Sequence, residues 1–330
     1  MLKLMGGGGK DTKPKIVPCC RSGSDAQQGR RMTMEDTHVH FDEVSEKYGF
    51  PKDVTRAFYA VYDGHGGRRA AEAAEVSPSD EEMLCFFLCV PFVVAHGNLL
   101  EQKFLHECLL KSEELKKNLT DDEVLEVMKG AFKRTDSIIM EQSRIQGWND
   151  GCTAVAALIL NTTFVFSPTL HVLCDSLHLH TLIASKHRLF IGNLGDAEAV
   201  IGRQKSEGLV AECVTYKHKP NSPEERERIE KAGGHVVFGR VLGSLAVSRA
   251  LGDAEFKMPR NKAEDDFVSS VPFLKAYSLG SDVPFMVIAC DGLWDKVCCL
   301  LAVLTSCNSV ITFFFHVFHT GHVPRRRGLC

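Results

Sequence analysis

Residues 57–67 read AFYAVYDGHGG and pass directly from an apolar run into a turn rich in glycine. The apolar run predicts a buried strand, and Asp63 stands at its end. Glycines on both sides of His65 let the backbone approach whatever Asp63 binds, so a main-chain carbonyl can join the carboxylate as an oxygen ligand. Oxygen ligands favour Mg²⁺ or Mn²⁺ over zinc. An ordinary Asp-Gly turn with an exposed histidine is the alternative that this stretch leaves open.

The same arrangement returns twice later in the chain. A predicted strand at residues 188–196 ends on Asp196, and an almost continuous apolar run at residues 283–290 is followed by Asp291. Asp295, four residues further on, would face the same way if a helical turn begins there. Carboxylates gathered at one end of a sheet repel one another, and divalent cations between them relieve that repulsion. Two bridged ions activate water for in-line attack on a phosphoryl group.

A further set of charged side chains lies at residues 30–37, which read RRMTMEDT. Glu35 and Asp36 are a second source of carboxylates, and Arg31 is a cation suited to phosphate oxygens. His65 could protonate a leaving alkoxide, because its unperturbed pKa lies near working pH. Taken alone, residues 30–37 are equally typical of a solvated hairpin edge.

Length and composition limit the function classes. A chain of 330 residues holds one large α/β or α+β domain or two smaller ones. The net charge of -3 leaves no basic excess to neutralise phosphates, so nucleic acid is not expected as the main partner. Thirteen cysteines, without the apolar run of a signal peptide, favour reduced thiols in the cytoplasm or the nucleus. The cysteines contain no Cys-x-x-Cys pair, which disfavours a zinc site.

Three segments have an atypical composition, namely residues 76–98, 161–185 and 297–330. Together they hold 82 residues with 7 of the 13 cysteines and 9 of the 20 phenylalanines, but only 7 charged side chains. None shows a period of a helix or a strand. We interpret them as translated intron or splice-variant sequence. Residues 297–323 have no Lys, Arg, Asp or Glu and formally allow a membrane anchor, which Asn308 and three histidines disfavour.

The remaining chain divides into an arm and a series of helices and strands. Residues 1–28 have no periodicity and predict a mobile arm. Helices are expected at residues 68–75, 101–117 and 121–145, and Thr120 with Glu123 forms a capping box for the third. A short charged helix is expected after Ser222, ended by Gly233 and Gly234.

Six motifs in order resemble those of the metal-dependent protein phosphatase 2C family. They are Arg31 with MED at 34–36, VYDGHGG at 61–67, GCTA at 151–154, NLGD at 193–196, GSLAVSR at 243–249 and ACDGLWD at 289–295. The resemblance covers roughly residues 29–296, interrupted at about 76–98 and 161–185. It implies an α+β fold, a four-layer α-β-β-α sandwich of two antiparallel sheets flanked by helices. It also implies two Mg²⁺ or Mn²⁺ ions and hydrolysis of phosphoserine and phosphothreonine in proteins.

The resemblance also implies roles for individual residues. Asp63 would bridge two metals, and Asp291 and the Gly64 carbonyl would each bind one. Glu35 and Asp36 would hold metal-bound waters, while Asp196 and Asp295 match a weaker third metal site. Arg31 matches the phosphate-binding arginine, His65 the proposed general acid, and residues 218–240 a flap that helps to choose the substrate. Phosphorylated proteins are the implied partners of an expected monomer.

The chain departs from the family pattern near its end. The family carries one further metal aspartate, followed by asparagine, on a late strand, and residues 297–330 contain no acid. We therefore expect a C-terminally truncated domain with a weakened second metal site. A catalytically impaired, phosphatase-like binding protein is the alternative. An aspartate-nucleophile phosphatase is disfavoured, because the second acid of such enzymes is absent two residues after Asp63.

Overall fold

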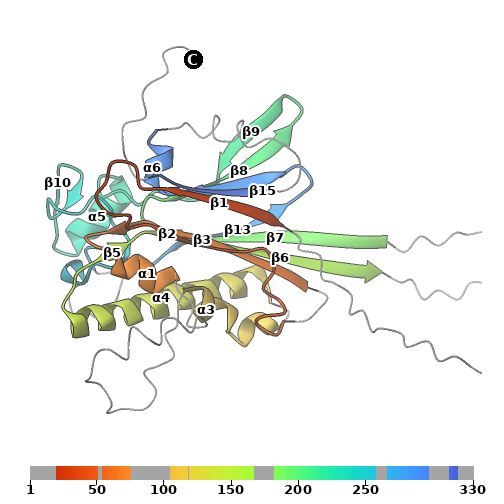
Figure 1. Cartoon of the computed structure of the whole chain (residues 1–330), viewed down its shortest axis with the longest axis horizontal. Coiled ribbons are helices and arrows are strands. Elements are labelled where there is room, and N and C mark those ends of the chain that lie inside the picture. Colours follow the sequence, from red (N-terminus) through yellow and green to blue (C-terminus); the bar gives the residue numbers. More distant parts are fainter. Residues whose placement is uncertain are drawn as a thin grey trace, which may run out of the picture.

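The computed structural model describes residues 20–50, 54–75, 105–117, 119–166, 182–257, 266–296 and 312–318. Two five-stranded sheets lie face to face, and helices cover the outer face of the first (Figure 1). The first sheet has the order β13-β7-β6-β3-β2, and every neighbouring pair in it is antiparallel. Its strands are β2 (Thr37–Phe41), β3 (Val54–Tyr62), β6 (Ala154–Phe166), β7 (Leu182–Leu194) and β13 (Phe273–Leu279).

The strand that ends on Asp63 is buried on both faces, which explains why its sequence has no polar alternation. Phe58, Ala60 and Tyr62 belong to the core between the sheet and the helices. Tyr59 and Val61 belong to the core between the two sheets. Since successive side chains of a strand point to opposite faces, β3 contributes to both layers.

Three helices cover the first sheet: α1 (Arg69–Glu75), α3 (Leu105–Leu110) and α4 (Asp121–Gln146). The predicted capping box at the start of α4 is confirmed, with Thr120 and Glu123 bonded to each other's backbone amides. The helix expected at residues 101–117 is shorter than predicted. It consists of α3 and a separate 3-10 turn, η1 (Glu114–Lys116), and residues 101–104 lie outside the described residues.

The second sheet has the order β1-β15-β14-β8-β9. Its strands are β1 (Arg21–Gln27), β8 (Glu198–Lys205), β9 (Gly208–Cys213), β14 (Phe285–Ala289) and β15 (Thr312–Phe318). The sandwich is confirmed, but this sheet is mixed, because β15 runs parallel to both β1 and β14. On its outer face, Trp294 of α6 (Asp291–Trp294) is buried and donates from Nε1 to the Ala289 carbonyl oxygen at 2.9 Å.

The expectation of a mobile arm at residues 1–28 needs correction, and two of the three atypical segments contain strands. Residues 21–27 of the expected mobile arm form β1, and residues 1–19 lie outside the described residues. Parts of two atypical segments also pair as strands: β6 and β7 remain in register as far as Phe166 and Leu182, and β15 lies in the tail. Residues 76–98, 167–181, 297–311 and 319–330 lie outside the description. Among the described residues, no helix is long and apolar enough to cross a membrane.

Smaller elements complete one end of the sandwich. They are β4 (Gly64–His65), β5 (Gly151–Cys152), β12 (Leu251–Gly252), η2 (Ala254–Phe256), β10 (Val236–Val237), β11 (Arg240–Val241) and α5 (Pro223–Lys231). Strands β12, β5 and β4 form a three-stranded sheet in that order. The predicted charged helix is confirmed as α5, with Ser222 as its N-cap and Pro223 at its first position.

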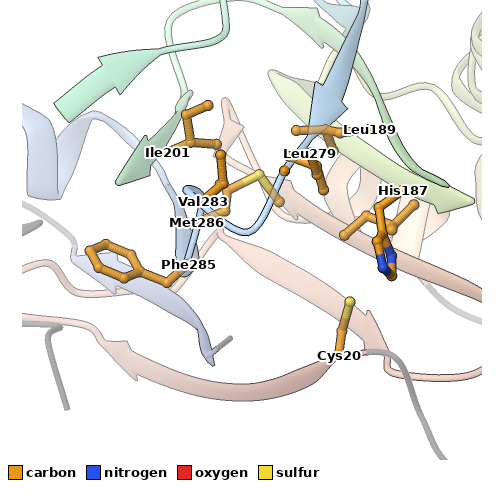
Figure 2. Close-up of a pocket in the computed structure, with 10 residues that line it drawn as sticks. Cys20, His187, Leu189, Ile201, Leu279, Val283, Phe285 and Met286 are labelled. Carbon is orange, nitrogen blue, oxygen red and sulfur yellow. The ribbon is translucent and has the colours of Figure 1, made fainter. Parts of the chain in front are cut away.

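A cavity of about 40 Å³ lies between the two sheets (Figure 2). Its lining is mainly apolar, with Leu189, Ile201 and Met286 among the residues, and Cys20 and His187 also face it. The cavity contacts β14 at its first residues, whereas Asp291 follows the last residue of that strand. It therefore lies near the opposite end of β14 from Asp291.

Candidate active site

Four aspartates from different elements meet at one end of the sandwich. Asp63 follows β3, Asp196 lies between β7 and β8, Asp291 follows β14, and Asp36 precedes β2. Desolvation, together with the charges of Asp36, Asp291 and Asp196, raises the pKa of Asp63 well above its usual range. Burial alone would raise this pKa, but the additional charge effects of Asp36, Asp291 and Asp196 require those carboxylates to lie near Asp63. The structure thus brings together the three strand-end acids that the sequence singled out.

Asp63 and Asp291 lie close together within this group. A carboxylate oxygen of each lies within 4.8 Å of the other and of the Cys290 sulfur. Burial and the charges of Asp196 and Asp295 also raise the pKa of Asp291. Carboxylates that raise one another's pKa fit hard divalent cations, because oxygen ligands suit Mg²⁺ and Mn²⁺. The donor set therefore fits the ions that the sequence predicts.

Cys290 belongs to the same cluster but has a different chemistry. Burial and the charge of Asp63 raise the pKa of its thiol far above the usual value. A protonated thiol is neither a nucleophile nor a metal ligand. Cys290 is therefore a small buried side chain that follows the last residue of β14.

Gly64 allows the segment of Glu35 and Asp36 to reach Asp63. A Cβ on Gly64 would lie closer than 3.0 Å to the carbonyl oxygen of Glu35 and 3.0 Å from its carbonyl carbon. The main chain of Glu35 thus passes directly over the turn. On the other side, the Thr153 amide donates to the Asp63 carbonyl oxygen at 2.9 Å. Only a residue without a side chain fits between these two segments.

His65 is held by Asp253, a residue whose place in the sequence favours holding a loop rather than a catalytic role. The Nε2 atom of His65 lies 2.9 Å from both carboxylate oxygens of Asp253. The small three-stranded sheet explains this contact, because Gly151 pairs with His65 on one side and with Gly252 on the other. A Cβ on Gly151 would lie closer than 3.0 Å to the Asp253 carboxylate. The carboxylate therefore crosses over Gly151 to reach the ring.

The charge of Asp253 changes the protonation of His65. Burial by itself favours the neutral ring, but the Asp253 carboxylate and its hydrogen bond raise the pKa of His65 above its ordinary value. Asp253 is itself buried, at 3% exposure. One signal in the sequence could have identified it: Gly252-Asp253 repeats the Gly-Asp ending of residues 195–196.

The other predicted residues lie at the edge of the cluster or pair elsewhere. The side chain of Arg31 is exposed and forms no ion pair with an acid in the described ranges. Glu35 is half-buried and Asp295 is exposed. Asp196 is buried and forms an ion pair with Lys219. No local sequence pattern marks Lys219 as a partner of this acid.

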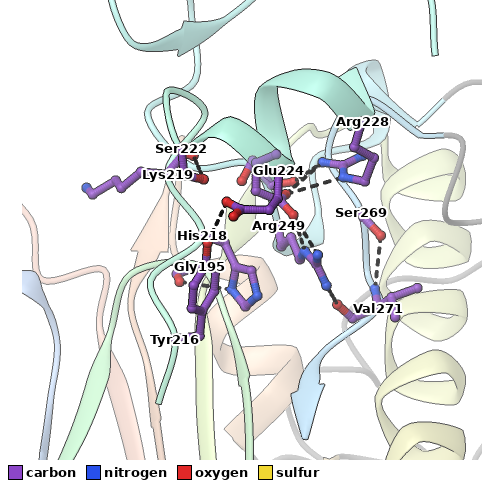
Figure 3. A network of polar contacts seen from close by, with 12 residues as sticks. Gly195, Tyr216, His218, Lys219, Ser222, Glu224, Arg228, Arg249, Ser269 and Val271 are labelled. Atoms are coloured by element: carbon purple, nitrogen blue, oxygen red, sulfur yellow. Dashed lines mark hydrogen bonds and ion pairs between the residues drawn. The ribbon is translucent and has the colours of Figure 1, made fainter. Parts of the chain in front are cut away.

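The flap segment begins at His218, which lies against Gly195, the residue before Asp196 (Figure 3). The His218 amide donates to the Gly195 carbonyl oxygen at 2.8 Å, next to the ion pair of Lys219. Burial and the nearby Arg249 charge lower the pKa of His218 to about 4. The ring is therefore neutral near pH 7, and this part of the flap is anchored to the sandwich by backbone bonds.

A buried ion triad holds the flap helix. Glu225 of α5 accepts hydrogen bonds at 3.0 Å from Arg249 Nε and from Arg228 Nη2. Arg249 also donates to the carbonyl oxygen of Val271 at 2.8 Å (Figure 3). Although burial opposes ionisation, the two guanidinium groups hold the pKa of Glu225 at about 2. Through the triad and this bond, Arg249 holds α5 against the loop of Val271.

Comparison with known proteins agrees with this geometry. The profile of the family Protein phosphatase 2C matches residues 20–83 and 94–299. Protein phosphatase 2C homolog 2 of Aspergillus flavus is 31% identical over 284 residues, which cover 84% of this chain and 52% of the relative. Probable protein phosphatase 2C 2 of Paramecium tetraurelia is 32% identical over 274 residues, 82% of this chain and 71% of the relative. The chain thus spans about half the length of the first of these proteins.

Solved structures show the same fold. The serine-threonine phosphatase 2C from Toxoplasma gondii has a TM-score of 0.55 at 20% identity, over 87% of this chain and 85% of that chain. A sex determining protein of C. elegans has a TM-score of 0.57 at 20% identity, over 85% of this chain and 53% of that one. The family match covers well over half of the sequence, and the acids converge in the matched residues. The chain therefore belongs to the protein phosphatase 2C family.

Proposed function

We propose that the chain hydrolyses phosphoserine and phosphothreonine in proteins with the help of Mg²⁺ or Mn²⁺. The observation that carries this proposal is the meeting of Asp36, Asp63, Asp196 and Asp291 at one mouth of the sandwich. Such a concentration of partly desolvated carboxylates is unfavourable unless cations neutralise it. A phosphate monoester is dianionic, so it also requires cations at its binding site.

The ligands of two ions, and of a weaker third, are assigned as follows. Asp63, Asp291 and the Gly64 carbonyl would hold the two ions directly, and Glu35 and Asp36 would hold their waters. Asp196 and Asp295 would serve the third, for which Lys219 is a competitor at Asp196. When bound, the ions would activate water for attack on phosphorus and neutralise charge on the phosphoryl oxygens.

The chain's own residues bind the phosphate and move the proton. Arg31, whose side chain is exposed, would hold two phosphate oxygens through its guanidinium. As water adds and the bond from phosphorus to the serine oxygen breaks, the departing oxygen takes a proton from His65. Because Nε2 donates to Asp253, the donor atom is Nδ1. The serine or threonine hydroxyl stays in the protein and inorganic phosphate is released. The attacking water gives up one proton to solvent, and a proton from solvent restores the protonated His65.

The direct test is hydrolysis of p-nitrophenyl phosphate with Mn²⁺ and with a chelator. We expect activity only with the metal, and we expect Asp63→Asn to abolish it. Asp122→Asn is the matched control, because Asp122 lies in the first turn of α4 and is exposed. Activity that persists in chelator, or in Asp63→Asn, would refute the proposal.

A second candidate is a phosphatase-like binding protein with impaired catalysis. It is favoured by the absence of Asp and Glu from residues 297–330, where the family has a further metal aspartate. In that case the wild-type chain binds a phosphoserine peptide, measured by calorimetry with Mn²⁺, but releases no phosphate. A chimera with a family-like C-terminal segment would then gain hydrolysis.

We also propose that the protein acts as a monomer in the cytoplasm or nucleus. Among the described residues, Cys152 and Cys213 are free thiols, the first buried and the second exposed. Free thiols are typical of reducing compartments. Light scattering of the purified chain tests the monomer, and imaging of a tagged chain tests the location.

A further inference from the structure

A buried ion pair supports the loop that carries Asp253. Lys257 Nζ lies 2.6 Å from Asp136 Oδ1 on α4, and the two side chains are only 3% and 11% exposed. The same carboxylate oxygen accepts the Gly252 amide at 2.9 Å, and Lys257 Nζ also donates to the Ala250 carbonyl oxygen at 2.9 Å. The loop is therefore bonded to this ion pair at Ala250 and Gly252 before Asp253, and at Lys257 after it.

The conformation of this loop needs such support. Gly252 has φ 77° and Asp253 has φ 55°, so two successive residues lie in the left-handed region. An aspartate in this region is less stable than in an extended conformation, and it persists where its surroundings hold it. A Cβ on Gly252 would lie closer than 3.0 Å to the Asp150 carbonyl oxygen. The Asp253 amide donates to that same oxygen at 3.1 Å.

We infer that Asp136 and Lys257 are positioning residues that hold the Asp253 carboxylate against His65. The inference rests on the proposed function, in which His65 protonates the departing oxygen. Neither Asp136 nor Lys257 contacts His65, and both act through the backbone of residues 250–253. A buried ion pair contributes little net stability compared with apolar residues of the same size. However, the ion pair makes hydrogen bonds to the backbone of the loop, and apolar side chains could not make those bonds.

The test compares two substrates in the variant Asp136→Asn, at saturating Mn²⁺. A phosphoserine peptide releases an alkoxide, which needs a proton, whereas p-nitrophenyl phosphate releases a weakly basic phenolate that does not. We expect the ratio of kcat for the peptide to kcat for p-nitrophenyl phosphate to fall about tenfold, with KM changed less than about twofold. A ratio measured in one preparation does not depend on the fraction that is folded.

Two further variants separate positioning from general stability. Asp121→Asn removes a carboxylate from the same helix and breaks its ion pair with Arg188, so we expect the substrate ratio to stay at the wild-type value. In a protein that already carries His65→Gln, Asp136→Asn should not change the substrate ratio further, because the effects of two substitutions that act through one group do not add.

Each outcome distinguishes the two proposals. An active wild type with an unchanged ratio in Asp136→Asn overturns the positioning inference and leaves the proposed function standing. A further fall of the ratio in the double variant with His65→Gln also overturns the inference. A wild-type chain that hydrolyses neither substrate overturns the proposed function, and the inference with it.

Discussion

Replacing Gly64 by alanine perturbs the site by one methyl group. Gly64 is not among the glycines with positive φ, so the substitution adds a contact and no backbone strain. The new Cβ would lie closer than 3.0 Å to the Glu35 carbonyl oxygen, 3.0 Å from its carbonyl carbon and 3.2 Å from its Cβ. Ordinary contact begins at 3.4 Å. The obstacle is backbone, which cannot rotate away as a flexible side chain would.

The segment of Glu35 and Asp36 must therefore retreat from Asp63. A displacement of about 1 Å at a catalytic centre lowers activity by about 100-fold, or about 2.7 kcal/mol of transition-state stabilisation. We expect this loss in kcat/KM for p-nitrophenyl phosphate with Mn²⁺. The Mn²⁺ concentration for half-maximal activity should rise as well, because Asp36 moves away from the other acids.

Gly23→Ala is the matched control. A Cβ on Gly23 would meet nothing within 4 Å, so activity and Mn²⁺ dependence should equal those of the wild type. Thermal unfolding followed by circular dichroism tells whether each variant is folded at the assay temperature. Gly64→Ala that stays folded and keeps more than a third of wild-type kcat/KM would refute the reasoning.

Three predictions concern stability. Glu225 has a depressed pKa of about 2, so its ionised form stabilises the fold by about 3 kcal/mol at pH values above the ordinary pKa of 4.5, and this contribution is lost as pH falls towards 2. The unfolding free energy, measured with urea at pH 7 and at pH 3, should therefore fall less in Glu225→Gln than in the wild type. An equal fall in both proteins would contradict this account. Thr120→Ala removes the cap of α4 and should lower the unfolding free energy, measured by urea denaturation, by about 1 kcal/mol. An unchanged unfolding free energy would show that the cap does not stabilise the protein. Gly192→Ala would place a Cβ 2.7 Å from the ring of Phe132 on α4, and should lower the unfolding free energy by about 1–3 kcal/mol in the same assay. An unchanged urea midpoint would show that α4 can shift without a loss of stability.

Most helices and strands could be predicted from local patterns. The capping box of Thr120 and the proline at the start of α5 mark helix ends, because the groups that satisfy the terminal amides are neighbours in sequence. The helix expected at residues 101–117 was wrong in length, since an apolar pattern does not show where a helix breaks. The strand β1 was missed, because the residues of Arg21–Gln27 are mostly exposed and polar and lack strand periodicity.

The sequence by itself marked three acids that meet at one end of the sandwich, because strand, turn and acid are adjacent at Asp63, Asp196 and Asp291. Only the tertiary structure decided how those acids are partnered. The contact of His65 with Asp253 spans 188 positions, and the ion pair of Lys257 with Asp136 spans 121. Contacts between residues so far apart depend on strand register and on glycines that let segments cross, and these are properties of the assembled fold rather than of any local pattern.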